Sequence, residues 1–89
     1  MTTADEIRKT LTEKLAATHI AIVDDSHRHA GHAGAKQGGH FTVQIVSKEF
    51  EGKSLPARHK LVYAALEILM KSKIHALALK TLTPEEFKK

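Results

Sequence analysis

The sequence contains no cysteine and no tryptophan, and it has only one tyrosine, three phenylalanines and two prolines. Without cysteine the chain forms no disulfides, and it builds no zinc finger or iron–sulfur site from its own thiolates. The few aromatic side chains offer little surface on which nucleic-acid bases could stack. Lysine, histidine or glutamate interrupts the apolar runs every few residues, so no stretch has the length of a membrane-spanning helix and we expect no membrane partner.

The length and the charge of the chain limit the number of domains and the kinds of partner that we expect. Its 89 residues, 42% of them hydrophobic, predict a single domain over residues 1–89 with one small core. The N-terminus has neither a basic start nor an apolar segment, so no signal peptide is visible and we expect a cytoplasmic or organelle-matrix protein. The net charge of +4 permits nucleic acid as a partner but does not require it.

Histidine and glycine are concentrated between Ser26 and His40. This segment contains four of the five glycines and four of the seven histidines, which are His27, His29, His32 and His40. Imidazole is the commonest protein metal ligand, and glycine lets a backbone bend around a bound group. We interpret the segment as a binding loop between two strands, with a solvated polar connection as the alternative.

Hydrophobic periodicity and capping residues predict an α+β domain. Thr3 and Glu6 have the spacing of a capping box, and apolar residues follow at intervals of four, so a helix is expected over residues 3–17. β-branched and alternating residues predict strands over 19–24 and 40–47, which a direct connection makes an antiparallel hairpin. Ser54 is expected to cap a helix that runs to about residue 71, and whether residues 55–60 form a separate turn stays open.

The end of the chain adds a strand and a short helix. Residues 74–82 alternate, and four of them are expected on one side: His75, Leu77, Leu79 and Thr81. Thr83 and Pro84, followed by two glutamates, are typical of a helix start. A strand, a helical crossover and a returning strand favour a parallel pair. The prediction is a three-stranded mixed sheet with helices on one face.

Several short segments together carry a family resemblance: Asp25-Ser26, His29-Ala30-Gly31-His32, His40-Phe41, Phe50-Glu51-Gly52-Lys53-Ser54, Arg58-His59-Lys60, Ile74-His75-Ala76-Leu77 and Thr81-Leu82-Thr83-Pro84-Glu85. In this order, over about two-thirds of the chain, they resemble the BolA family. The resemblance implies a fold like the class II KH domain, with the element order α-β-β-α-(α)-β-α. It also implies that the protein acts as a partner of monothiol glutaredoxins in iron–sulfur cluster trafficking and iron regulation. Some bacterial members are DNA-binding transcriptional regulators of stress and cell shape, which is the alternative function.

The resemblance further implies a shared [2Fe–2S] cluster, with thiolates from the glutaredoxin and from bound glutathione. Such a cluster can accept two imidazoles on one iron. His75 aligns with the C-terminal histidine that family members use as a ligand, and His29 aligns with a loop ligand that is histidine or cysteine in different subfamilies. His32 can replace His29, or can form with His27 a separate histidine-only site for zinc, copper or nickel. From the residues alone, the simpler interpretation of His75 is a half-buried strand histidine with a satisfied hydrogen bond.

The nucleic-acid alternative depends on basic residues in the second half of the chain. A KH domain grips nucleotides through a GxxG loop between its central helices, but no glycine occurs between Ser54 and Lys89. Six residues could still make weak, salt-dependent contacts with phosphate or with a partner: Lys53, Arg58, His59, Lys60, Lys71 and Lys73. The alternative is that they form only a solvated surface. We expect a partner protein to dock on residues 52–60, His75 and the histidine loop, and we interpret His40 and His59 as structural or partner-facing.

The sequence shows no constellation typical of catalysis. No pair of carboxylates has a spacing suited to acid–base work. The two serines after the histidine loop, Ser47 and Ser54, have the positions of a strand end and a helix cap. We therefore expect no enzymatic activity.

Overall fold

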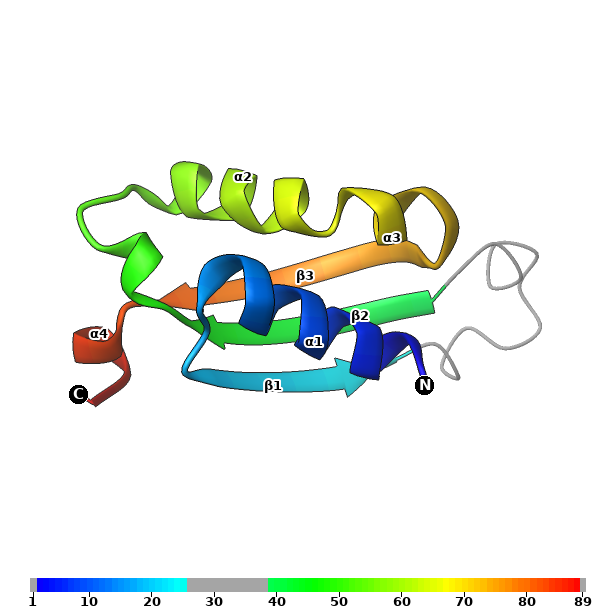
Figure 1. Ribbon diagram of the computed structural model, residues 1–89, viewed down its shortest axis with the longest axis horizontal. Helices are drawn as coiled ribbons and strands as arrows, with labels where there is room; N and C mark the ends of the chain where they lie inside the picture. Colours follow the sequence, from blue (N-terminus) through cyan, green and yellow to red (C-terminus); the bar gives the residue numbers. More distant parts are fainter. Residues whose placement is uncertain (1, 26–38, 89) are drawn as a thin grey trace.

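The chain forms a three-stranded sheet with helices packed along it, and the computed structural model describes residues 2–25 and 39–88 (Figure 1). The elements in chain order are α1 (Thr3–Leu15), β1 (His19–Asp24), β2 (Gly39–Val46), the short 3-10 helix η3 (Lys48–Phe50), α2 (Leu55–Ala65), α3 (Glu67–Ser72), β3 (Ile74–Leu82) and α4 (Pro84–Lys88). Within the described ranges, no helix has the length and apolar character needed to cross a membrane.

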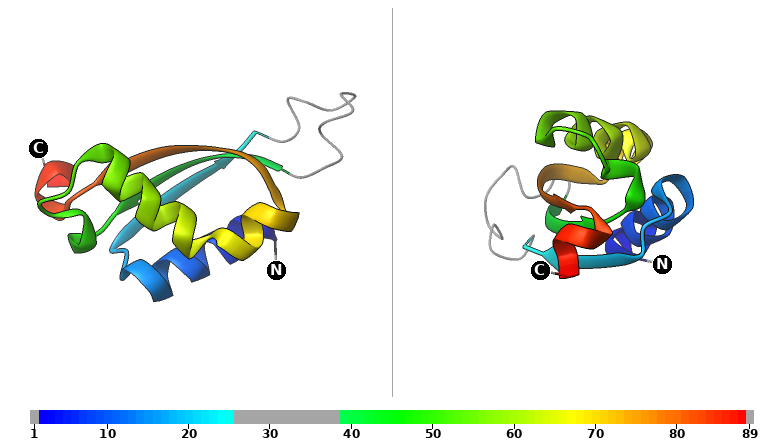
Figure 2. Two further views of the ribbon diagram at one scale, coloured as in Figure 1. Left: turned by 90° about the horizontal axis from the view of Figure 1, so that it is seen from above. Right: turned by 90° about the vertical axis from the view of Figure 1, so that its left-hand side faces the viewer.

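The strands lie in the order β1-β2-β3, with β1 and β2 antiparallel and β2 and β3 parallel. Helices α1, α2 and α3 lie on one face of the sheet, and α4 packs at the end where β3 finishes (Figure 2). The helical crossover returns the chain to the starting end of β2, which makes β3 parallel to it. The predicted α+β class and mixed sheet are confirmed, and each strand begins within one residue of its predicted start.

The core lies between the inner face of the sheet and the apolar stripes of the helices. Phe41, Val43 and Ile45 alternate along β2 and are at most 4% exposed. The helices and η3 add further fully buried side chains: Ile7, Leu11, Phe50, Val62 and Leu66. Burial of each such side chain stabilises the fold by roughly 1.5–3 kcal/mol.

The start of α1 differs from the prediction. Its N-cap is Thr2, whose hydroxyl accepts a hydrogen bond from the Asp5 N–H at 3.1 Å, while the Asp5 carboxylate accepts one from the Thr2 N–H at 3.1 Å. The predicted capping box, placed one residue later, is therefore wrong. The helix also ends earlier than predicted, at Leu15, because Ala16 adopts a left-handed conformation with φ 49°.

The helical crossover is divided at Leu66. Ser54 caps α2 as predicted, because its hydroxyl accepts a hydrogen bond from the Ala57 N–H at 3.4 Å. Leu66 departs from helical geometry with φ −97° and ψ 12°, and its side chain is fully buried. The crossover therefore contains two helices, and residues 55–60 belong to the first of them.

Helix side chains contact the backbone of both outer strands. Arg8 of α1 donates from Nη1 to the Ile20 carbonyl of β1 at 2.8 Å. Tyr63 of α2 donates its hydroxyl to the Leu77 carbonyl of β3 at 3.4 Å. Each of these contacts occupies a carbonyl that an added strand would otherwise use.

Candidate functional site

His75 lies in a β-bulge at the start of β3. Gly39 of β2 pairs with Ile74, and the next residue of β2, His40, pairs with Ala76, so His75 is the extra residue of β3. A bulge leaves its extra residue outside the regular ladder and changes the direction of the side chain. His75 is exposed, although its neighbour Ile74 is buried.

This bulge overturns one detail of the sequence-based prediction. Leu77 and Leu79 pair with Phe41 and Val43, whose side chains belong to the core. Simple alternation would place His75 on the same side as Leu77 and Leu79, but the extra residue interrupts the alternation. The prediction of one shared side for His75, Leu77, Leu79 and Thr81 is therefore wrong.

His40 and His75 bring two imidazoles together from neighbouring strands. Their ring centres are 5.1 Å apart and their ring planes are inclined by 44°. His40 is half-buried and, by the alternation of β2, points to the face opposite Phe41. The His40 carbonyl accepts a hydrogen bond from the Asp25 N–H at 2.7 Å, which fixes the chain after β1 to the start of β2.

A shallow pocket of about 250 Å³ adjoins His40. Its lining includes Asp25, Thr42, Ala76 and Ala78. The Thr42 hydroxyl donates to the Asp25 carboxylate at 3.2 Å. The two alanines leave space beside the imidazole, and the carboxylate places negative charge in the pocket.

The other predicted ligands, His29 and His32, and their neighbour His27 lie outside the described residues. The segment that contains them follows β1 and returns at the start of β2, so it connects to the fold at the same end of the sheet as His75 (Figure 1). Among residues 2–25 and 39–88, no group of three or more His, Cys, Asp or Glu side chains could hold a metal ion. Of the predicted metal ligands, the structure therefore places His75 alone.

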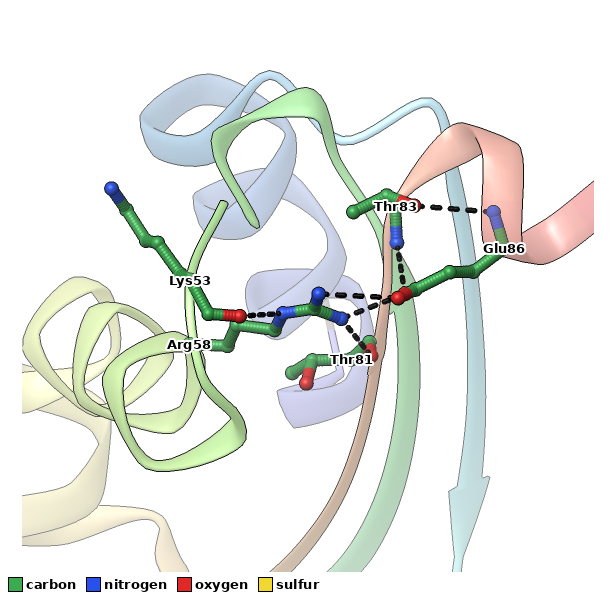
Figure 3. Close-up of polar contacts among 5 residues, drawn as sticks. All are labelled: Lys53, Arg58, Thr81, Thr83 and Glu86. Carbon is green, nitrogen blue, oxygen red and sulfur yellow. Dashed lines mark hydrogen bonds and ion pairs between the residues drawn. The ribbon is translucent and has the colours of Figure 1, made fainter. Parts of the chain in front are cut away.

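Arg58 is buried rather than exposed on the surface of α2 (Figure 3). Its Nη1 and Nη2 donate to Oε1 and Oε2 of Glu86 at 2.7 and 3.2 Å. Nη1 also donates to the Thr81 carbonyl at 3.2 Å, and Nε donates to the Lys53 carbonyl at 2.9 Å. The guanidinium thus joins α2 to the end of β3 and to α4. We correct the expectation that Arg58 contacts phosphate or a partner, because its donors are used inside the fold.

The ion pair with Arg58 changes the acidity of Glu86. Hydrogen bonds from the Arg58 side chain and from the Thr83 N–H lower the pKa of Glu86 from 4.5 to about 2. The hydrogen bond to Glu86 in turn raises the pKa of Arg58. Thr83 and Glu86 also form a capping box for α4, because the Glu86 N–H donates to the Thr83 hydroxyl at 3.1 Å and the carboxylate accepts from the Thr83 N–H at 2.9 Å.

The other residues of the predicted basic set are paired with a glutamate, exposed or half-buried. Lys73 Nζ lies 2.9 Å from Glu6 Oε2, and this pair connects the end of the crossover to α1. Lys71 Nζ lies 3.8 Å from Glu67 Oε1 on the exposed surface of α3. The other members of the predicted set lie at or before the first turns of α2 and are exposed or half-buried: Lys53, His59 and Lys60. These three are the better candidates for contact with phosphate.

The predicted docking surface divides between two ends of the molecule. Residues 52–60 lie beside the end of β3, where Arg58 contacts Thr81 (Figure 1). His75 lies at the start of the same strand. From residue 75 to residue 81 a strand advances about 20 Å, at about 3.3 Å per residue. A partner that binds at His75 therefore reaches the contact of Arg58 with Thr81 only by following β3 over this distance.

The sequence analysis missed two side-chain pairings, that of Arg58 with Glu86 and that of His40 with His75. Only the first of them has a signal in the sequence. Arg58 precedes Val62 by four residues and shares the buried stripe of α2 with it. An arginine on a buried stripe needs an internal partner, because burying an unpaired charge is costly. The pairing of His40 with His75 left no comparable signal, because it depends on the bulge.

Comparison with known proteins gives these features a family context. A family model described as BolA-like protein matches residues 11–86. The chain is 42% identical over 87 residues to Protein BOLA1, chloroplastic, of Arabidopsis thaliana, and the match covers 93% of this chain and 54% of that protein. The chain therefore spans about half the length of this relative. It is 38% identical over 85 residues to the DNA-binding transcriptional regulator BolA of Escherichia coli, with 91% of this chain and 79% of that protein covered.

Solved structures lead to the same family. The BolA domain of SufE1 from Arabidopsis thaliana matches with a TM-score of 0.83 and 40% sequence identity, over 97% of this chain and 96% of that domain. The residues matched by the family model include the start of β3 with His75 and the ion pair of Arg58 with Glu86. The chain belongs to the BolA-like protein family.

Proposed function

We propose that this protein is a non-enzymatic partner of a monothiol glutaredoxin and that the two proteins share one [2Fe–2S] cluster. In this proposal His75 supplies one ligand and His29 supplies the second, with His32 as the alternative in the same segment. Thiolates of the glutaredoxin and of glutathione complete the coordination. The cluster is cargo in iron–sulfur trafficking or a signal in iron regulation, so no catalytic residue is needed.

The exposed position of His75 is the observation that carries this proposal. The bulge presents the imidazole outside the core, while the backbone of β3 is held by its pairing with β2. Two imidazoles can replace two thiolates on one iron of a [2Fe–2S] cluster. Because the chain contains no cysteine, the sulfur ligands have to come from partner molecules, as the proposal requires.

The ligand set also suggests the compartment. Glutathione and a ligating cysteine remain reduced in the cytoplasm and in organelle matrices, where structural disulfides are rare. We propose that the protein acts in such a compartment. The relatives compared above carry no enzyme name, which agrees with a role in binding and transfer.

The test is a titration of a [2Fe–2S]-loaded monothiol glutaredoxin with this protein, followed by visible absorption and circular dichroism. We expect a spectral change that saturates at one protein per cluster and is lost or altered with His29→Ala and with His75→Ala. His19→Ala is the matched control, because His19 is exposed at the opposite end of the sheet, where it stacks on Phe87 with ring centres 4.6 Å apart.

The possible outcomes test the existence of the complex and the identity of its two histidine ligands separately. A complete spectral change with His75→Ala would refute the assignment of His75. If His75→Ala has an effect and His29→Ala has none, the second ligand of the cluster is His32 or a ligand from outside this chain. No spectral change with the wild-type protein would refute the shared cluster itself.

Binding of duplex DNA is the second candidate function. It is favoured by the relative from Escherichia coli, which is named a DNA-binding transcriptional regulator. In this chain the phosphate contacts would come from Lys53, His59 and Lys60. Because so few cations are involved, we expect weak binding at low salt that fades at physiological salt. Nanomolar binding to one duplex sequence at physiological salt would instead make this the main function.

A further inference from the structure

The end of the sheet that carries His75 holds a second imidazole. We propose that His40 and His75 together form a two-imidazole site that binds one divalent transition-metal ion, such as Ni²⁺ or Cu²⁺, on the isolated protein. The site uses the two strand histidines and no residue of the segment between β1 and β2. It requires neither glutaredoxin nor an iron–sulfur cluster, so it goes beyond the proposed function.

The spacing of the two rings fits a common metal ion. A metal-bound imidazole nitrogen lies about 2.1 Å from the ion, which places the ring centre about 3 Å away. Two imidazoles on one ion, with bonds at about the tetrahedral angle, then have ring centres about 5 Å apart. The observed separation of 5.1 Å between His40 and His75 matches this value. The inclination of 44° between the ring planes also differs from a parallel stack.

Both imidazoles are attached to a backbone that is already in place. The Gly39 N–H donates to the Lys73 carbonyl at 3.0 Å, one residue before His40 and two residues before His75. The Asp25 N–H donates to the His40 carbonyl at 2.7 Å on the other side of β2. Ligands on paired strands keep their spacing better than ligands on loops, so little order has to be imposed when a metal binds.

The surroundings of the pair favour a cation with open coordination positions. The pocket beside His40 is lined by the small side chains of Ala76 and Ala78, which leave room for water ligands. Imidazole suits nickel, copper and zinc better than it suits magnesium or calcium. Because the described residues offer no cluster of three ligands, we expect a weak and exchangeable site rather than a permanent metal centre.

The test begins from a protein in which His27, His29 and His32 are all replaced by asparagine. Isothermal calorimetry with Ni²⁺ is expected to show one site per chain. His40→Phe and His75→Phe, made separately in this protein, are each expected to weaken Ni²⁺ binding at least tenfold. Phenylalanine keeps an aromatic ring in the contact between the strands but removes the nitrogen ligands. His19→Phe is the matched control and is expected to leave binding unchanged, and circular dichroism verifies the fold of each variant.

Electron paramagnetic resonance with Cu²⁺ counts the ligating nitrogens directly. The protein without the three loop histidines is expected to give the coupling pattern of two imidazole nitrogens, and His40→Phe the pattern of one. Absence of Ni²⁺ binding in that protein would overturn the proposal. Equal Ni²⁺ binding by the folded His40→Phe variant, or a pattern of one nitrogen before that substitution, would overturn it as well. The shared cluster is tested with the unaltered chain and glutaredoxin, so the two proposals succeed or fail separately.

Discussion

The guanidinium of Arg58 lies 2.7 Å from the carboxylate of Glu86, and this ion pair joins α2 to α4. The arginine side chain is only 10% exposed, whereas the glutamate side chain is 44% exposed. The pair is therefore anchored in the protein at the arginine and open to solvent at the glutamate. Because the two side chains differ in burial, removing Arg58 and removing Glu86 are expected to affect the stability of the fold differently.

Loss of Arg58 is expected to destabilise the fold strongly. Arg58→Ala leaves the carbonyls of Lys53 and Thr81 without their donor, removes buried volume from α2 and leaves Glu86 unpaired. Together these effects are expected to lower the free energy of unfolding by about 2–4 kcal/mol. Urea unfolding followed by circular dichroism measures the loss. Arg58→Lys keeps the charge but not the forked geometry, so it should restore only part of the stability. Wild-type stability of Arg58→Ala would contradict the structural role.

The lowered pKa of Glu86 predicts how stability depends on acid. The pKa of Glu86 is about 2 in the folded protein, compared with 4.5 in its ordinary state. A carboxyl group whose pKa falls on folding stabilises the fold fully above its unfolded pKa, and this stabilisation is lost as the pH decreases toward the folded value. The melting temperatures of the wild type and Glu86→Gln are therefore expected to converge between about pH 4.5 and pH 2. A difference that stays constant over this range would show that the ionised carboxylate is not responsible.

Much of the fold was predictable because local signals agreed with the tertiary structure. The alternation of Phe41, Val43 and Ile45 marks the core side of β2, and this side is indeed buried. Ser54 begins α2 with the expected cap, and Thr83 does the same for α4. The parallel pairing of β2 and β3 followed from the length of the crossover rather than from any single residue.

Several of the details that escaped prediction depend on contacts distant in sequence. The bulge at His75 arises from its register against β2, which period-two alternation within one strand does not determine. The division of the crossover at Leu66 has no glycine or proline to mark it. The partner of Arg58 lies on a different helix at the end of the chain. The predictions for His29 and His32 fall outside the described residues and stay predictions.

The environments of the lysines predict which of them contribute to DNA binding. Lys60 is exposed at the first turns of α2, whereas Lys73 is paired with Glu6 at 2.9 Å. Lys60→Gln is expected to weaken binding to a duplex at low salt and to reduce the slope of log affinity against log salt by about 1. Lys73→Gln removes the same charge and serves as the control, with a smaller expected effect. Fluorescence anisotropy of a labelled duplex measures both, and equal effects would mean that the contact surface is not at α2.

Competition between the two proposed sites provides the sharpest test of their relationship, because both use His75. Ni²⁺ bound by His40 and His75 occupies the imidazole that the cluster requires, so Ni²⁺-saturated protein is expected to give a reduced spectral response when it is added to [2Fe–2S]-loaded glutaredoxin. Removal of Ni²⁺ with a chelator should restore the response, and the loaded glutaredoxin alone is the control for direct damage to its cluster.

His40→Phe separates the sites, because it weakens Ni²⁺ binding but leaves His75 in place. That variant should therefore lose less of its response to the cluster in the presence of Ni²⁺ than the wild type does. If Ni²⁺ has no effect on the wild-type response, the metal ion and the cluster do not compete for His75.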